Sequence, residues 1–312
     1  MAKHNITIAF YNVENLFDTV DNPFTYDDDF TTEGKRRWNK KRYFKKLGKL
    51  ARTISKIGKD ESYFLPAIVG LVEVENKRVL DDLIAQKSLK GYYDYVHYDS
   101  SDERGIDTAL LYQPDFFKVL SSESHPLILF DDDGSRDYTR DILEVHGKLF
   151  GEKIYFLVNH WPSRRKGQEL SEPERLKASN LLVDIMNSIK KRDKKAKFVI
   201  MGDFNDNPDN RSIENVVGEG LINPMELLFD RGLGTLTHKK EWHLFDQIIL
   251  SKEFKKDSSK LSFKKAKIHS KESLKVFRGK LKGSPFRTFI GPWYKGGVSD
   301  HFPVYALFKK KD

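Results

Sequence analysis

The apolar residues of the chain gather in short runs, which alternate with charged segments and with stretches of helical periodicity. Several runs are continuously apolar, a pattern typical of strands that are buried on both faces. From these runs we predict strands at residues 6–13, 67–74, 108–112, 116–120, 142–149, 154–159, 198–202, 245–250 and 302–308.

Apolar side chains recur at helical spacing over residues 38–57 and 171–191, which predicts two long helices. Ser171 and Glu174 form a capping-box pattern at the start of the second one. A shorter helix is expected at residues 77–85. Many strands with helices between them predict an α/β (α+β) fold, a layered sandwich that forms a single domain over residues 1–312.

Two segments interrupt this pattern. Residues 18–34 are acidic and polar, and residues 251–283 are rich in lysine, so we expect the latter to be a basic insertion or loop. Residues 34–46 combine cations with Trp38, Tyr43 and Phe44. A nucleic-acid-binding surface uses cations for phosphates and aromatic rings for stacking. In the alternative interpretation Tyr43 and Phe44 belong to the apolar helix face, and the cations form a solvated surface.

The amino-acid composition excludes some kinds of active site and indicates the charge of a binding partner. Lys and Arg exceed Asp and Glu by 55 to 46, a net charge of +9, and there is no Cys. The absence of Cys excludes disulfides, thiolate metal sites and a cysteine nucleophile. The positive charge favours an acidic partner, which is a nucleic acid, a phosphorylated small molecule or an anionic membrane surface.

No apolar run approaches the roughly 20 residues that cross a bilayer, and the N-terminal residues enter a strand pattern without an apolar leader. We therefore expect no integral membrane segment. The protein is expected to be cytoplasmic, or exported with its leader already removed, and to be a monomer.

Polar groups stand repeatedly at the ends of the predicted apolar strands. Phosphodiester hydrolysis needs a cation, a group that activates water and stabilisation of the leaving oxygen. Mg²⁺ and Mn²⁺ prefer carboxylate, carbonyl and water oxygens. The candidates are Asn12, Glu14 and Asn15, Glu73, His160, Asp203 and Asn205, Asp246, and Asp300 with His301.

Each of these groups alone has a structural explanation. A Gly-Asp-x-Asn sequence is usually a turn, Glu73 suits a helix N-terminus, and a lone His160 is more often a hydrogen-bonded histidine than a catalyst. The hypothesis of a catalytic site therefore rests on their conjunction in one chain.

The segments that carry these residues are, in order, NVEN, GLVEVE, VNHWPSR, GDFND, FDQIIL and SDHFPV. This series, which spans residues 5–308, resembles the endonuclease/exonuclease/phosphatase superfamily, and NVENLFD with NHWPSR resembles its bacterial extracellular-nuclease-like group. The resemblance implies a four-layer sandwich of two packed mixed β-sheets flanked by helices.

The resemblance also implies roles. Glu73 would be the main metal ligand, with Asn12, Glu14 and Asp300 near it, and the metal would be Mg²⁺, with Mn²⁺ or Ca²⁺ as alternatives. Asp203 would orient or activate water, Asn205 and His160 would contact the phosphate, and Asp246 would orient His301. Which residue is the general base stays open.

Further candidates lie around this set. Arg104, Arg140, Arg164 and Arg165 are expected to bind the substrate, although an exposed surface arginine is the alternative for Arg140. Asp107 could orient His160 or be a turn residue.

We therefore predict a divalent-metal-dependent phosphodiesterase that hydrolyses nucleic acid. The alternatives are a phosphoinositide phosphatase or a sphingomyelinase-like phosphoesterase of the same superfamily, and a module that binds without turnover. A lipid enzyme needs an exposed apolar loop or hairpin at the mouth of its site, and the sequence suggests none.

Overall fold

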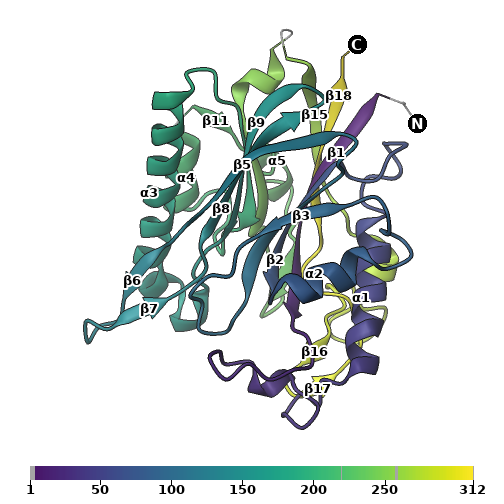
Figure 1. Ribbon diagram of the computed structural model, residues 1–312. Helices are drawn as coiled ribbons and strands as arrows, with labels where there is room; N and C mark the ends of the chain where they lie inside the picture. Colours follow the sequence, from purple (N-terminus) through teal and green to yellow (C-terminus); the bar gives the residue numbers. More distant parts are fainter. Residues whose placement is uncertain (1–3, 219, 257–258, 312) are drawn as a thin grey trace.

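The computed structural model describes residues 4–218, 220–256 and 259–311. Two six-stranded sheets pack face to face, with helices on both outer surfaces (Figure 1). The first sheet has the order β15-β18-β1-β2-β4-β3, and the second has the order β11-β14-β10-β9-β8-β5. Both sheets mix parallel and antiparallel pairs, so the expected four-layer sandwich is confirmed.

The strands of the first sheet are β1 (Asn5–Leu16), β2 (Ile68–Val74), β3 (Asp94–His97), β4 (Asp107–Tyr112), β15 (Leu261–Ile268) and β18 (Val304–Lys310). Those of the second are β5 (Phe117–His125), β8 (Ile142–Leu149), β9 (Glu152–His160), β10 (Phe198–Asp203), β11 (Leu221–Ile222) and β14 (Asp246–Ser251). Short hairpins pair β6 (Ile128–Phe130) with β7 (Arg136–Tyr138), β12 (Leu236–His238) with β13 (Glu241–His243), and β16 (Phe289–Ile290) with β17 (Trp293–Tyr294).

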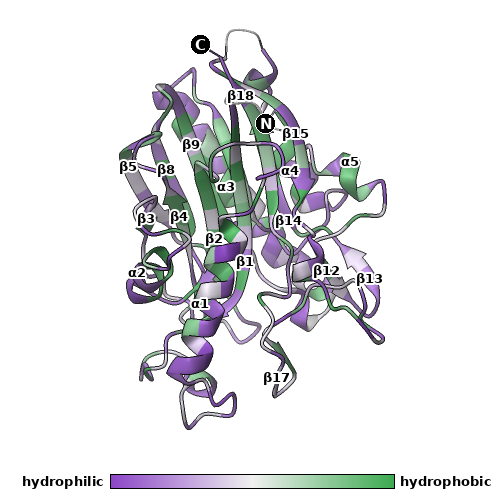
Figure 2. Cartoon of the chain, turned by 90° about the vertical axis from the view of Figure 1, so that its right-hand side faces the viewer, coloured by the Kyte–Doolittle hydropathy of each residue, from purple (hydrophilic) through white to green (hydrophobic). Residues whose placement is uncertain are grey.

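The helices divide between the two outer surfaces (Figure 1). α1 (Lys40–Ile54) and α2 (Lys77–Ile84) cover the first sheet, and α3 (Gln168–Arg192) and α4 (Arg211–Gly218) cover the second. A short α5 (Glu226–Phe229) follows β11. Apolar side chains from both sheets form one cluster between them, and further clusters beneath the helices bury the outer faces. Burial on both faces explains the continuously apolar strand runs (Figure 2). Among the described residues, no helix has both the length and the apolar character that crossing a membrane requires.

Three local predictions are wrong. Residues 251–283 are not only a loop, because β15 pairs with β18 along the edge of the first sheet. Lys264, Lys265 and Lys267 hid this strand, because their charges interrupt the apolar pattern. Lys265 and Lys267 pair with Glu61. The charge of this stretch is thus partly neutralised within the protein.

The second concerns the start of α3. Ser171 is not its N-cap, because the helix begins at Gln168 and the cap is Gly167. The Ser171 hydroxyl instead donates a hydrogen bond of 2.5 Å to the Gly167 carbonyl, one turn earlier.

The third concerns the basic segment of α1. Phe44 is 48% exposed and does not belong to the core, whereas Lys46 is only 2% exposed and is not part of a solvated face. Tyr43 is buried as expected.

Candidate active site

Irregular ends of β1 and β2 aim the first group of polar side chains. Asn12 pairs with Val72 and Leu16 with Val74, so the register shifts between them. Glu73 lies within this shift and has a φ of +65°, a left-handed conformation rarely adopted by a residue with a side chain. β-Bulges of this kind redirect a side chain from the sheet face, and strained backbone often marks functional sites.

Asn12 joins the two sheets. Its Nδ2 donates to Glu73 Oε1 at 3.2 Å and to Asp203 Oδ2 at 3.0 Å. The other oxygen of Glu73 accepts a 2.7 Å bond from the Asn15 amide. Burial alone would raise the pKa of Glu73, but the positive charges of Arg104 and His301 outweigh burial and lower it. Glu73 is therefore held as a carboxylate.

The second sheet supplies a row of three side chains. In the β-sheet register Asp203 at the end of β10 lies opposite His160 of β9 on one side and Asp246 of β14 on the other. The adjacent strands β9, β10 and β14 thus present these three side chains next to one another at one edge of the sheet. Burial raises the pKa of Asp203 to about 6, although His301 counteracts this.

His301 approaches this row from the first sheet. Its Nδ1 lies 2.7 Å from Asp246 Oδ2, and its Nε2 lies 3.8 Å from Asp203 Oδ2. Asp246 Oδ2 also accepts a bond from the Thr235 hydroxyl. Burial opposes protonation of His301, but the charges of Asp246 and Asp203 outweigh it and raise its pKa well above the usual value. The geometry orients the imidazole and favours its charged form.

His160 completes the cluster but lacks the expected orienting partner. Its Nε2 lies 3.9 Å from Glu73 Oε1, and its buried Nδ1 has no hydrogen-bond partner among the described residues. Asp107 instead accepts a bond from the Ser100 hydroxyl, so the hypothesis that it orients His160 is not supported. Burial, reinforced by Arg140 and Arg104, lowers the pKa of His160 well below its usual value. The ring is therefore neutral.

Asn205 is fixed beside Asp203 by a tight turn. It has a φ of +51°, its amide donates to Asp203 Oδ1 at 3.0 Å, and its Nδ2 donates to the Trp161 carbonyl at 3.0 Å. Arg164 supports this turn, donating to the Asn205 carbonyl at 2.7 Å and to Asp206 at 2.6 Å. Arg164 was expected on the substrate, but its guanidinium is committed to these protein acceptors.

The other three arginines differ in their exposure and in how many protein acceptors their guanidinium groups contact. Arg104 donates to Asn15 Oδ1 at 3.2 Å and thus lies next to the Glu73 cluster. Arg140 is half-buried, donating to Asp102 at 3.1 Å and to the Trp161 carbonyl at 3.0 Å. Arg165 is exposed. Arg104 and Arg165 are therefore better placed than Arg140 to meet a ligand.

Glu14 does not join the metal-ligand candidates with which the resemblance grouped it. Its carboxylate accepts bonds from the Thr288 amide at 2.6 Å and the Phe289 amide at 3.4 Å, and Arg287 lies 3.6 Å away. Its backbone is left-handed, with a φ of +51°. Glu14 thus anchors the segment that leads to His301.

Asp300 is only 28% exposed at its side chain, and its Oδ2 accepts a 2.8 Å bond from Arg287. Its Oδ1 lies 3.9 Å from His301 Nε2. Asp300 is therefore at the edge of the cluster, tied to the same arginine that contacts Glu14.

Sequence reasoning missed three supporting residues. Lys46 is buried and donates to the Glu14 carbonyl and, at 2.8 Å, to Thr288 Oγ1. Its spacing from Tyr43 and Leu50 placed it on the apolar face of α1, a signal that was available. Thr235 and Arg287 carried no such signal, because their partners are remote in sequence.

The donor set fits a divalent cation. Glu73 and Asp203 offer carboxylate oxygens on either side of Asn12, and such hard oxygen ligands with additional waters suit Mg²⁺. Asp203 and Asp246 also lie close together, with a carboxylate oxygen of each within 4.8 Å of the other. The chemistry of the residues therefore agrees with a metal at this edge of the sandwich.

A two-sheet sandwich that gathers carboxylate, amide and imidazole groups at one edge has the groups that metal-assisted hydrolysis of a phosphoester uses. The chain belongs to the endonuclease/exonuclease/phosphatase family, whose model matches residues 7–310. Members of this family hydrolyse phosphoesters and generally require a divalent metal. The sequence has no match among curated proteins.

Solved structures show the same fold. An endonuclease/exonuclease/phosphatase family protein of Bacteroides thetaiotaomicron is 18% identical with a TM-score of 0.61, and the match covers 98% of each chain. A mannosyl-6-phosphatase of that organism is also 18% identical (TM-score 0.59, 97% of this chain and 99% of the other). Truncated TDP2 of Caenorhabditis elegans is 17% identical (TM-score 0.60, 98% and 97%). At such identities the likeness concerns the fold and not the substrate.

Proposed function

We propose that the protein is a divalent-metal-dependent phosphodiesterase that hydrolyses nucleic acid with weak sequence preference. The observation that carries this proposal is the Asn12 bridge, which holds Glu73 of one sheet against Asp203 of the other, with His301 Nε2 3.8 Å from Asp203. One cluster thus contains a carboxylate that can bind a cation (Glu73), a carboxylate that can activate water (Asp203) and a charged imidazole (His301).

Each residue has a proposed role. Asp203 accepts the proton of the attacking water or orients it, as its raised pKa of about 6 allows. The protonated His301, held by Asp246, donates to a phosphate oxygen as negative charge builds there. Asn205 and the neutral His160 supply further donors, to the phosphate and to the leaving oxygen.

Asn12, Glu73 and Asp300 are the proposed metal ligands, with Mg²⁺ as the first choice and Mn²⁺ or Ca²⁺ as alternatives. A bound cation would neutralise charge on the phosphate oxygens. Glu14 is not proposed as a ligand, because its carboxylate is engaged by Thr288, Phe289 and Arg287.

The surroundings of the cluster support a nucleic-acid substrate. A groove of about 470 Å³ beside Asp102 is lined by Phe24 and Tyr26, which are 91% and 72% exposed. Asp102 also accepts a bond from the amide of Arg104, so this groove adjoins the site. Exposed aromatic rings stack on the bases of single strands. The charged residues of this lining are Asp28, Asp102 and Glu103, so the groove would hold bases by stacking and not phosphates by charge.

A substrate panel tests this proposal. Metal-stripped protein, reconstituted with Mg²⁺, is given single-stranded DNA, duplex DNA, RNA, sugar phosphates, inositol phosphates and sphingomyelin vesicles at two salt concentrations. We expect nucleic acid to be cleaved fastest, with a steep loss at higher salt. Hydrolysis of the small phosphates alone would contradict the substrate, and hydrolysis of none would contradict the chemistry.

One observation favours a second function, that of a lipid phosphoesterase. The β16–β17 hairpin, near the end of β1, exposes 37% of Ile290 and 70% of Trp293 (Figure 1). The sequence did not suggest such an apolar hairpin. Trp293→Ala distinguishes the two functions: for a lipid enzyme it lowers hydrolysis of vesicles far more than hydrolysis of soluble substrates, whereas a nuclease without membrane contact shows no such difference.

A further inference from the structure

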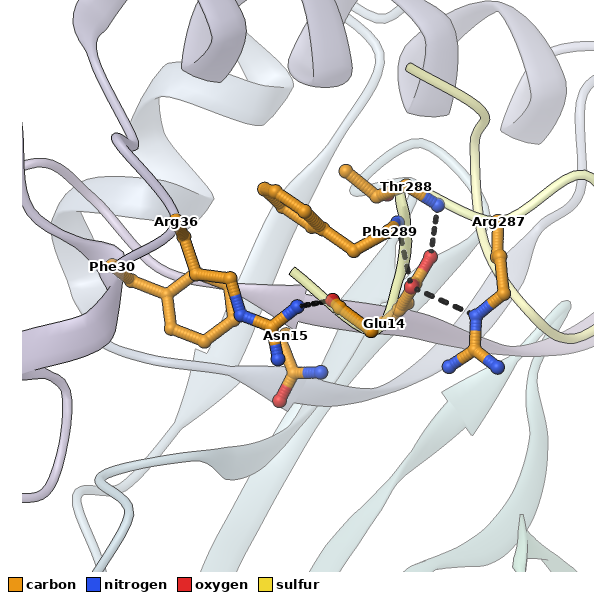
Figure 3. A pocket seen from close by; sticks show the side chains of 8 residues that line it. Glu14, Asn15, Phe30, Arg36, Arg287, Thr288 and Phe289 are labelled. Carbon is orange, nitrogen blue, oxygen red and sulfur yellow. Dashed lines mark hydrogen bonds and ion pairs between the residues drawn. The ribbon is translucent and has the colours of Figure 1, made fainter. Parts of the chain in front are cut away.

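A small cavity lies directly beside the candidate active site, between the end of β1 and the segment before β16 (Figure 3). Its volume is about 80 Å³. This is several times the roughly 10–15 Å³ that a single water needs, so a group larger than one water can enter. The lining residues are Glu14, Asn15, Phe30, Arg36, Arg287, Thr288, Phe289 and Gly291.

Two guanidinium groups from distant segments line this cavity. Arg36 lies over the rings of Phe30 and Phe289, at 5.6 and 5.0 Å from their centroids, and donates to the Gly291 carbonyl. Arg287 lies on the opposite side, as Figure 3 shows. A guanidinium has five N–H donors, and the bond to Gly291 uses one of those on Arg36. Contact with two nearly perpendicular rings restricts where the guanidinium can lie, which leaves its remaining N–H groups as donors within the lining.

The acceptors of the lining are already engaged. The Glu14 carboxylate receives the amides of Thr288 and Phe289 together with Arg287. The Asn15 side-chain oxygen accepts from Arg104, which leaves its amide N–H groups as the donors it can offer. Arg36 and Asn15 therefore contribute N–H donors to the lining, while the carboxylate of Glu14, which also lines the cavity, is already compensated by two backbone amides and Arg287. Such a lining suits an anion.

The cavity is coupled to the catalytic cluster through two bonds. The backbone N–H of Asn15 donates to Glu73 Oε2 at 2.7 Å, and Arg287 donates to Asp300 Oδ2 at 2.8 Å. An anion held here would thus lie next to the residues proposed to hold the metal and the scissile phosphate.

We propose that this cavity binds a second phosphate group of the substrate, adjacent to the one that is cleaved, with Arg36 as the principal contact. The inference rests on the proposed function, since it assigns that site a substrate with at least two neighbouring phosphates. A guanidinium fork matches two phosphate oxygens at once, which an ammonium does not. The site accordingly selects oligonucleotides over esters that carry a single phosphate.

A binding measurement without metal tests the subsite independently of catalysis. Inorganic phosphate is titrated by calorimetry into the full-length protein in EDTA, using wild type, Arg36→Gln, Arg36→Lys and the control Lys35→Gln, whose side chain is 85% exposed. We expect Arg36→Gln to weaken phosphate binding about 10-fold or more, Arg36→Lys to weaken it less, and Lys35→Gln to change it less than about 2-fold.

Phosphate binding that is equal in wild type and both folded Arg36 variants, or absent in wild type, would overturn the proposal. A kinetic comparison then separates the subsite from the chemistry. For Arg36→Lys the KM for a dinucleotide carrying a 5′-phosphate should rise about 10-fold more than the KM for bis(p-nitrophenyl) phosphate, which has one phosphorus. If no ester is hydrolysed by wild type, the proposed function fails while the calorimetry still decides the subsite.

Discussion

The side-chain amide of Asn12 donates a 3.0 Å hydrogen bond to Asp203, a residue 191 positions later in the chain. The same nitrogen contacts Glu73 at 3.2 Å, so one amide separates two carboxylates that would otherwise repel each other. This contact ties the ends of β1, β2 and β10 together. The relative position of the two sheets therefore determines the geometry of the site.

Removal of this bridge should reduce turnover. We expect Asn12→Ala to lower kcat about 100-fold, because the carboxylates move apart and a misplacement of about 1 Å costs that much. The matched control is Asn5→Ala, which removes an amide at the other end of the same strand, where Asn5 donates to the Glu61 carbonyl at 2.9 Å. Steady-state kinetics with a single-stranded oligonucleotide measures both. Equal kcat losses in the two variants would show that the Asn12 effect is only structural.

Glu14 and Glu73 should differ in their effect on metal binding. Glu73→Gln removes a proposed ligand and should weaken Mg²⁺ binding at least about 10-fold. Glu14→Gln should change Mg²⁺ binding less than about 3-fold. It should nevertheless lower kcat, because Glu14 anchors the Thr288 amide. Titration of Mg²⁺ by calorimetry, with an oligonucleotide assay alongside, separates these effects. Equal weakening of Mg²⁺ binding in both variants would show that Glu14 is a metal ligand.

The two groups that hold His301 should not contribute equally. Asp246→Asn removes the charge that orients and protonates the imidazole and should lower kcat about 1,000-fold. Thr235→Val removes only the hydroxyl that donates to Asp246 and should lower kcat no more than about 10-fold. Steady-state kinetics gives kcat and KM separately for the two variants. A loss confined to KM in Asp246→Asn would argue against this role.

Asp107 should make stability depend on pH. Burial raises its pKa from 3.8 to about 7, so the folded state binds a proton that the unfolded state releases. The free energy of unfolding therefore falls as pH rises from about 4 to 7, by roughly 4 kcal/mol at 1.36 kcal/mol per pKa unit. Asp107→Asn abolishes this loss. Thermal unfolding in EDTA should show the variant more stable than wild type at pH 8 and equal to it near pH 3.5, and a constant difference would contradict this.

The sequence predicted the parts of the structure that depend on local pattern. Continuous apolar runs identified most strands of both sheets, and polar residues at their ends identified Asn12, Glu73, Asp203, Asp246 and His301, all of which lie in one cluster. Strand ends can be read from hydropathy because a buried strand excludes polar groups until it reaches the sheet edge.

The rest depended on backbone detail and on remote contacts. The backbone amides of Thr288 and Phe289 hold Glu14, although it shares with Glu73 the pattern of a strand-end acid. Arg164 follows His160 closely in sequence, yet the turn around Asp206 captures it. A hydropathy pattern shows where a side chain leaves the sheet and not which groups it contacts, so the partners of these two residues could not be predicted from it.

The central claim is that the cluster around Asp203 hydrolyses phosphodiesters with a divalent metal. The most direct test is the initial rate at which metal-stripped protein cleaves a single-stranded DNA oligonucleotide as Mg²⁺ is added, for wild type and Asp203→Asn. We predict no cleavage in EDTA, recovery with Mg²⁺, and a rate at least about 1,000-fold lower in the variant. Cleavage that persists in EDTA, or that proceeds equally in the variant, would contradict the claim.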